Sequence, residues 1–255
     1  MHDEADQAAA SVDRFHPTGA VAVTGASSGI GEAVAMALGR LGVTVVGLDR
    51  APPNRVPPRG VFMAMDVTNE SEVELTVAAA EAQVGQLSGL VNAAGILGKV
   101  HSPERLRLAD WEKELQVDLT GTYIVSKAAG VRMAQRSRGA IVNVASIAAF
   151  KSPARSVVYS GLKAGVLGIT RAAAADLGAR RIRVNAVAPG AVPTEGTAKH
   201  RNAELDARRI ARTPLGRLGT VEDIADAICF LAGDGARFVN AEVIRLDGGA
   251  SETSL

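Results

Sequence analysis

The sequence has few aromatic residues, almost no net charge and no long apolar run. Aromatic side chains make up 3% of the 255 residues, which argues against a stacking surface for single-stranded nucleic acid. The formal net charge of +1 gives no strong attraction to nucleic acid or to an anionic membrane. No apolar run reaches about 18 residues, so no transmembrane helix is expected.

Cysteine and histidine are also scarce. Cys229 has no partner for an internal disulfide, which fits a reducing cytoplasm, and we expect it to be a small buried apolar residue. The four histidines are widely separated, so no metal site is expected. Residues 1–16 carry four acids and no signal-peptide pattern, and we expect them to be a mobile tail. The remaining residues, 17–255, are expected to form a single domain.

Short apolar runs alternate with helical patterns along this domain. The alternation predicts an α/β fold, with a doubly wound, seven-stranded parallel sheet and helices on both faces. The ligand of such a sheet binds at the carboxyl ends of the strands. The expected strands cover 20–24, 43–48, 61–65, 87–91, 140–145, 181–187 and 241–246, and the expected helices cover 29–41, 69–84, 110–136, 156–177 and 220–233.

A glycine-rich turn follows the first expected strand. Residues 24–31 read Thr-Gly-Ala-Ser-Ser-Gly-Ile-Gly, and a strand, a turn and a helix in this order place backbone N–H groups where they can bind a pyrophosphate. The glycines at 25, 29 and 31 depart from the G-x-G-x-x-G spacing, so spacing alone leaves a plain turn as the alternative.

The second expected strand ends at an acidic residue. Asp49 lies 18 residues after Gly31, where a carboxylate can accept hydrogen bonds from both ribose hydroxyls of an adenosine and repel a 2′-phosphate. This favours NAD over NADP. Arg50 is the counter-argument, because a basic residue there can hold a phosphate.

A tyrosine and a lysine stand four residues apart in the helix expected over 156–177. This spacing puts Tyr159 and Lys163 on one face of the helix. A nearby ammonium lowers the pKa of a phenol, and such a phenol can exchange a proton with an alcohol or ketone oxygen. Ser146 ends the preceding strand, where its hydroxyl can bind the same oxygen. An ordinary amphipathic helix is the alternative when the pair is taken alone.

Two further motifs, Asn92-Ala93-Ala94-Gly95 and Pro189-Gly190, complete a series that runs from about residue 19 to residue 249. In this series the chain resembles the classical short-chain dehydrogenase/reductase family. The resemblance implies an NAD(P)-dependent oxidoreductase that interconverts a secondary alcohol or diol and a ketone by hydride transfer. It also implies a small-molecule substrate, a homotetramer, and a substrate lid at about 195–217.

The resemblance assigns roles to individual residues. Tyr159 becomes the acid/base, Lys163 its activator and a ligand of the nicotinamide ribose, and Ser146 the residue that orients the substrate oxygen. The residues expected to hold the cofactor are Gly25, Ser27, Ser28, Gly29, Ile30, Gly31, Asp49, Arg50, Asp66, Val67, Asn92, Ala93, Ala94, Gly95, Tyr159, Lys163, Pro189, Gly190, Val192 and Thr194.

One position departs from the family pattern. Asp118 stands where the family usually has an asparagine that orders a water chain to the catalytic lysine. An ionised aspartate cannot donate hydrogen bonds and brings a negative charge near Lys163. Asp118 is therefore a candidate catalytic residue, and it puts the proton relay in doubt rather than the hydride chemistry.

Two other functions stay open. The first is an NADPH-dependent 3-oxoacyl thioester reductase, which Asp49 disfavours, and the second is a weakly catalytic NAD-binding sensor or structural protein. The lid segment is expected to be irregular and carries six Lys or Arg against three acids. Either it attracts an acidic substrate or it is a solvated helical flap.

Overall fold

The structure is a computed structural model and describes residues 19–98 and 102–252. The tail predicted over 1–16 lies outside the described residues.

The described strands form one parallel sheet, as predicted. Their spatial order is β3-β2-β1-β4-β5-β6-β7, and the order reverses between β1 and β4. A crevice for a ligand is expected at such a reversal, outside the carboxyl ends of the strands. The strands are β1 (Ala20–Thr24), β2 (Val45–Asp49), β3 (Gly60–Ala64), β4 (Leu87–Asn92), β5 (Gly139–Val144), β6 (Ile182–Pro189) and β7 (Val243–Leu246).

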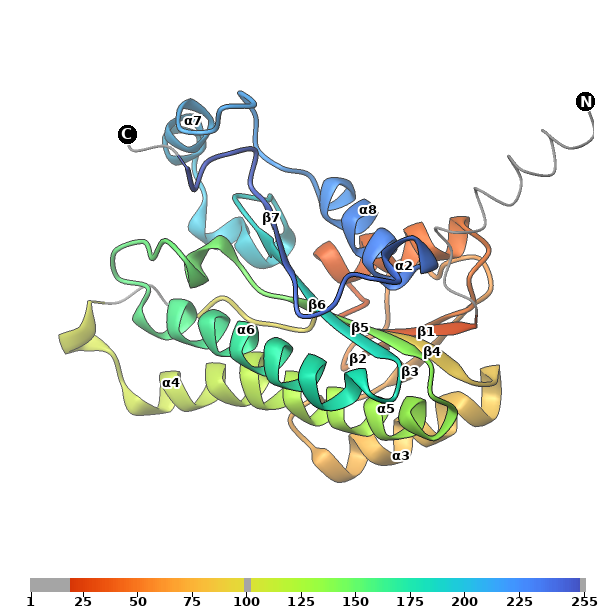
Figure 1. The fold of residues 1–255 in the computed structure, drawn as a ribbon. Coiled ribbons are helices and arrows are strands. Elements are labelled where there is room, and N and C mark those ends of the chain that lie inside the picture. Colours follow the sequence, from red (N-terminus) through yellow and green to blue (C-terminus); the bar gives the residue numbers. More distant parts are fainter. Residues whose placement is uncertain (1–18, 99–101, 253–255) are drawn as a thin grey trace, which may run out of the picture.

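Helices cover both faces of the sheet (Figure 1). On one face α2 (Gly29–Arg40) packs beside α8 (Val221–Ala232). The other face is covered by α3 (Glu70–Val84), α5 (Thr122–Arg136) and α6 (Val157–Gly178). Together the layers confirm the predicted doubly wound domain.

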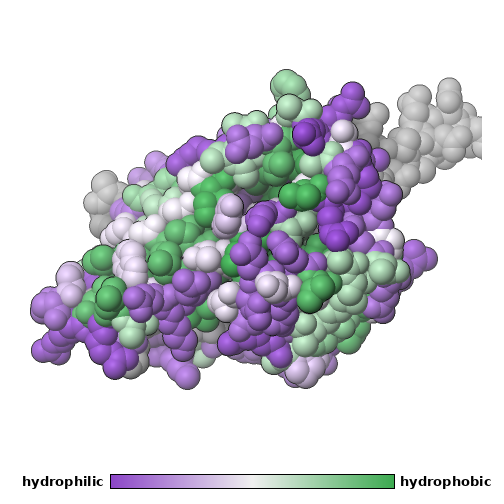
Figure 2. Space-filling model, turned by 90° about the horizontal axis from the view of Figure 1, so that it is seen from below, coloured by the Kyte–Doolittle hydropathy of each residue, from purple (hydrophilic) through white to green (hydrophobic). Residues whose placement is uncertain are grey.

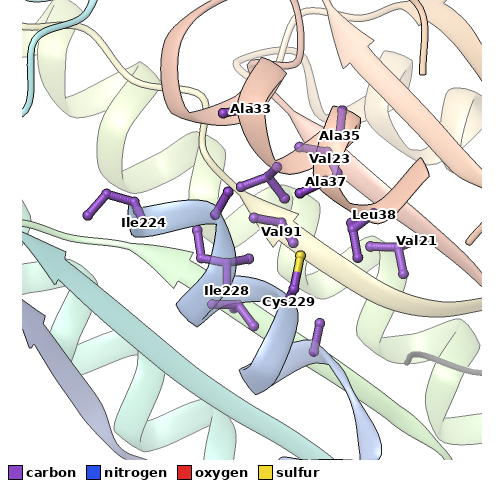
Figure 3. Close-up of a cluster of buried hydrophobic side chains, with 14 of the residues drawn as sticks. Val21, Val23, Ala33, Ala35, Ala37, Leu38, Val91, Ile224, Ile228 and Cys229 are labelled. Atoms are coloured by element: carbon purple, nitrogen blue, oxygen red, sulfur yellow. The ribbon is translucent and has the colours of Figure 1, made fainter. Parts of the chain in front are cut away.

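A buried cluster joins α2 and α8 to the central strand β1 (Figure 3). Val21 and Val23 of β1 pack with Leu38 of α2 and Ile228 of α8. Cys229 belongs to the same cluster, and burial raises the pKa of its thiol to about 12. The interpretation of Cys229 as a small apolar core residue is thereby confirmed.

The helix predicted over 110–136 is not a single α-helix. It consists of α4 (Leu108–Glu114), a π-helical segment (Leu115–Gly121) and α5. Propensity cannot distinguish an α-turn from a π-turn, because both use the same residues. Segments of π-helix occur frequently at functional sites, and this one contains Asp118.

The predicted irregular lid is largely helical, so that prediction was wrong. It contains a 3-10 turn (Glu195–His200) and α7 (Ala203–Ala211). The Asn202 side chain accepts a hydrogen bond from the Leu205 N–H and thereby caps α7. Four of its basic side chains are ion-paired: Arg201 and Arg209 with Asp206, Arg208 with Glu204, and Arg217 with Asp223. The pairing favours the solvated flap over a site that attracts an acidic substrate.

Apolar side chains are exposed on α4 and α5. Figure 2 views the molecule from the side on which α4 and α5 lie in Figure 1, and apolar patches there interrupt the charged surface. Leu108 of α4 and Tyr123 and Val131 of α5 are exposed. The structure describes one chain, so the homotetramer stays a prediction.

Among the described residues, no helix is both long and apolar enough to cross a bilayer.

Candidate active site

A cavity of about 340 Å³ opens at the carboxyl ends of the strands, where the strand order reverses. Asp49 and Asp66, at the ends of β2 and β3, line it on one side of the reversal. Ser146 and Pro189, at the ends of β5 and β6, line it on the other side. The fold thus brings into one cavity motifs that are far apart in the sequence.

Most of the predicted site residues line this cavity. The lining includes all four candidate catalytic side chains and eighteen of the residues expected to hold the cofactor. They are Gly25, Ser28, Gly29, Ile30, Gly31, Asp49, Arg50, Asp66, Val67, Ala93, Ala94, Gly95, Asp118, Ser146, Tyr159, Lys163, Pro189, Gly190, Val192 and Thr194.

Two predicted cofactor residues lie outside the lining and support it instead. The Ser27 N–H donates to Asp49 Oδ2 at 3.1 Å, which ties the glycine turn to the end of β2. Asn92 is buried and donates from Nδ2 to Ser126 and to Asn143, both at 2.8 Å. These contacts hold β4 against β5 and α5, so the structure gives Asn92 a supporting position.

Sequence reasoning missed several lining residues. Most are apolar neighbours of predicted ones, and their position beside a polar strand end was the only signal available. Gly196 and Thr197 fall within the lid expected at 195–217 but were not named individually, and the Thr197 hydroxyl forms a capping box with Thr194. The lining residues that were not named individually are Leu48, Met65, Ile96, Leu97, Val117, Val144, Ala145, Gly196 and Thr197.

The glycine turn suits a pyrophosphate. A Cβ on Gly31 would lie 2.1 Å from the Gly25 carbonyl oxygen, so only glycine lets α2 begin this close to β1. The N-cap residue of α2, Ser28, makes no side-chain cap. Backbone N–H groups in the first turn of α2 therefore face the cavity without a side-chain acceptor, which is the donor set that a phosphate uses.

Two carboxylates lie where an adenosine is expected. Asp49 accepts hydrogen bonds from the N–H groups of Ser27 and Arg50, at 3.1 and 2.7 Å. The hydrogen bond from the Thr68 N–H lowers the pKa of Asp66, and burial opposes it. Arg50 is largely exposed, with Nη1 3.9 Å from Asp66 Oδ2. A ribose at Asp49 and an adenine at Asp66 fit this end of the cavity.

The candidate catalytic side chains come from β5 and α6. Lys163 Nζ lies 5.6 Å from the centre of the Tyr159 ring, which confirms that the two side chains share a helix face. Ser146 begins a 3-10 turn, and its Oγ accepts a hydrogen bond from the Ala148 N–H at 3.1 Å. The Ser146 hydroxyl is thereby oriented while its proton stays available for a substrate oxygen.

Lys163 and Asp118 form a buried ion pair. Nζ of Lys163 lies 3.2 Å from Asp118 Oδ2 and donates to the Val144 carbonyl at 3.3 Å, and the two residues are 5% and 1% exposed. Burial lowers the pKa of Lys163, but the charges of Asp118 and Tyr159 and the hydrogen bond to Asp118 together outweigh burial and raise the pKa overall. Lys163 is therefore held in its charged form beside Tyr159.

No group of three or more His, Cys, Asp or Glu side chains within residues 19–98 and 102–252 is placed to hold a metal ion. The side chains that the cavity presents for chemistry include a phenol, an ammonium, a hydroxyl and carboxylates.

Comparison with known proteins agrees with this geometry. A family model described as "Enoyl-(Acyl carrier protein) reductase" matches residues 25–251. The chain is 38% identical to 2-(S)-hydroxypropyl-CoM dehydrogenase 3 of Xanthobacter autotrophicus, over 90% of this chain and 95% of that protein. It is 36% identical to the 3-oxoacyl-[acyl-carrier-protein] reductase FabG of Pseudomonas aeruginosa, over 89% and 95% of the two chains.

A solved structure shows the same architecture. The gluconate 5-dehydrogenase of Burkholderia cenocepacia, crystallised in complex with NADP and tartrate, superimposes with a TM-score of 0.90 at 28% identity, over 95% of this chain and 99% of that one. The sequence motifs, the sheet order and these likenesses agree: the chain belongs to the classical short-chain dehydrogenase/reductase family and is an oxidoreductase.

Proposed function

We propose that this protein interconverts a secondary alcohol and a ketone with NAD as the hydride carrier. One observation carries the proposal. Tyr159, Lys163 and Ser146 line the same cavity as Asp49, and Asp49 lies on the other side of the strand reversal. The glycine turn and Asp49 would hold NAD, which would supply the acceptor for the hydride of the carbinol carbon. The chain's own residues bind the cofactor and manage the proton.

The proton steps follow from the geometry of the catalytic side chains. In the oxidation direction the alcohol oxygen gives its proton to the Tyr159 phenolate as the C–H bond breaks. Lys163 stabilises that phenolate by its charge, and the Ser146 hydroxyl holds the substrate oxygen in reach. In the reverse direction the Tyr159 hydroxyl protonates the oxygen of the reduced ketone.

Asp49 supports NAD as the preferred cofactor. Replacing Asp49 by alanine removes both the ribose acceptor and the repulsion of a 2′-phosphate. We expect Asp49→Ala to lower the ratio of kcat/KM for NAD over NADP by about tenfold or more. That factor corresponds to a loss of about 1.4 kcal/mol in the discrimination between the two cofactors. Steady-state kinetics with both cofactors measures the ratio, and an unchanged ratio would show that Asp49 is not the selector.

The NADPH-dependent 3-oxoacyl thioester reductase stays the second candidate. The likeness to a FabG reductase favours it, as does the exposed Arg50 side chain, which a 2′-phosphate can reach. A reductase of this class would prefer NADPH and reduce a 3-oxoacyl thioester faster than it oxidises a simple alcohol. Assaying both reactions with both cofactors separates the two candidates.

The ion pair of Asp118 with Lys163 predicts a pH effect. The carboxylate favours the charged Lys163 but also cancels part of the field that Lys163 exerts on the Tyr159 phenolate. In Asp118→Asn the phenolate itself and the Val144 carbonyl still favour the charged Lys163. The field on the phenolate is then no longer partly cancelled, so oxidation should reach its plateau at a lower pH, with the protein still folded. The pH profiles of kcat/KM for both proteins check this. Coincident profiles, or a shift to higher pH, would contradict it.

A further inference from the structure

A second carboxyl group lies buried near the active site. Glu114 ends α4, four residues before Asp118, and is 4% exposed. Glutamate is rarely buried this fully, because its charged form loses hydration. Glu114 does not line the cavity, and the chemistry proposed above does not use it.

Glu114 and Asp118 hold the same loop. The segment that follows β4, residues 93–98, passes over both carboxyl groups. Asp118 Oδ1 accepts a hydrogen bond from the Ile96 N–H at 2.8 Å, and the Glu114 carboxyl accepts one from the Gly98 N–H. Ile96 and Leu97 line the cavity between these two anchors.

The loop backbone at position 98 lies directly against the Glu114 carboxyl group. A Cβ on Gly98 would lie 1.7 Å from Glu114 Oε1 and 2.2 Å from its carboxyl carbon. The backbone of Gly98 is outside the left-handed region, so the collision with Glu114 is what opposes alanine there. A side chain at position 98 would therefore displace the Glu114 carboxyl group from its place under the loop.

The surroundings of the Glu114 carboxyl group suit a hydrogen-bond acceptor rather than an isolated negative charge. Burial raises the pKa of Glu114, the charge of Asp118 raises it further, and the Gly98 N–H opposes both. A carboxyl group in either protonation state still offers an oxygen to an N–H donor. The hydrogen bond to Gly98 thus survives a change in protonation of Glu114.

We propose that Glu114 is a positioning residue that, together with Asp118, fixes the backbone of residues 96–98, so that Ile96 and Leu97 form a rigid wall of the substrate side of the cavity. The role given to this wall rests on the proposed function. Glu114 acts through the loop and touches no reacting atom.

Kinetic variants separate this role from a general effect on stability. We expect Glu114→Ala to raise KM for the alcohol by roughly fivefold to tenfold, as the loss of one buried hydrogen bond implies, with a smaller change in kcat. Glu114→Gln keeps the acceptor oxygen and should recover most of that loss. Glu112→Ala removes an exposed glutamate from the same helix and is the matched control. Equal KM effects in the alanine and glutamine variants, or a loss in kcat alone, would overturn the proposal.

A double-mutant cycle tests the contact without any substrate. We expect Gly98→Ala to lower the unfolding temperature in the wild-type background, because the added methyl group expels the carboxyl group of Glu114. In the Glu114→Ala background the same substitution should have little effect. Additive shifts would show that Gly98 and Glu114 do not touch, and the proposal would fail. A protein that shows this coupling and yet oxidises no alcohol would contradict the proposed function while leaving the contact intact.

Discussion

Replacing Tyr159 by phenylalanine is expected to lower kcat for alcohol oxidation by at least about a hundredfold, since a positioned acid/base contributes roughly 10²–10⁴-fold. The ring stays in place beside Lys163, but it has no oxygen to take the proton from the alcohol. Cofactor binding should change little, because Tyr159 is only one of the expected cofactor contacts and the others, including the glycine turn, Asp49 and Lys163, are untouched. Turnover rates and titration with NADH measure the two effects separately.

The sequence offers a matched control for this substitution. Its other tyrosine, Tyr123, is exposed on α5 and does not line the cavity. Tyr123→Phe removes the same hydroxyl and should leave kcat unchanged. If Tyr159→Phe kept a tenth or more of the wild-type kcat, Tyr159 would not be the acid/base.

The second large effect concerns stability. Lys163→Met leaves Asp118 without its cation at a position where the carboxylate is 1% exposed. Removing one partner of a buried ion pair costs about 3–5 kcal/mol, because the remaining charge is desolvated and uncompensated. We therefore expect the free energy of unfolding to fall by about that amount in denaturant titrations. Activity should be lost as well, since Tyr159 loses its neighbouring charge.

Two further variants test the cause of that destabilisation. Lys163→Met combined with Asp118→Asn removes both charges and should recover most of the lost stability. Lys127→Met, on α5, breaks exposed ion pairs with Glu70 and Glu74 of α3 and should change the free energy of unfolding little. A double variant as unstable as Lys163→Met would mean that the methionine itself, and not the orphaned carboxylate, destabilises the fold.

The parts of the site that the sequence predicted are those fixed by local spacing. The four-residue spacing of Tyr159 and Lys163 sets a shared helix face, whatever the rest of the chain does. Ser146 and Asp49 each follow an apolar run, and the parallel sheet brings all such strand ends to one edge. Predicting the alternation of strands and helices was therefore enough to predict where the motifs meet.

What the sequence did not show depends on tertiary packing. Glu114 reads as a surface residue of an amphipathic helix, because glutamate is mostly exposed, and only the fold buries it under Gly98. The π-helical segment around Asp118 uses residues that an α-helix also accepts. Asn92 lies in a motif associated with the cofactor, but its amide nitrogen donates to Ser126 and Asn143.

Hydride transfer from a panel of secondary alcohols that carry deuterium on the carbinol carbon is a direct test of the proposed alcohol oxidation. The wild-type protein is incubated with each alcohol and with either NAD or NADP, and the reduced cofactor is analysed by mass spectrometry. We expect deuterium in the nicotinamide ring with at least one alcohol, transferred faster to NAD than to NADP. With Tyr159→Phe we expect no deuterium transfer under the same conditions. Folded protein that binds NADH and transfers deuterium from no alcohol in the panel, or transfers it only to NADP, would contradict the account.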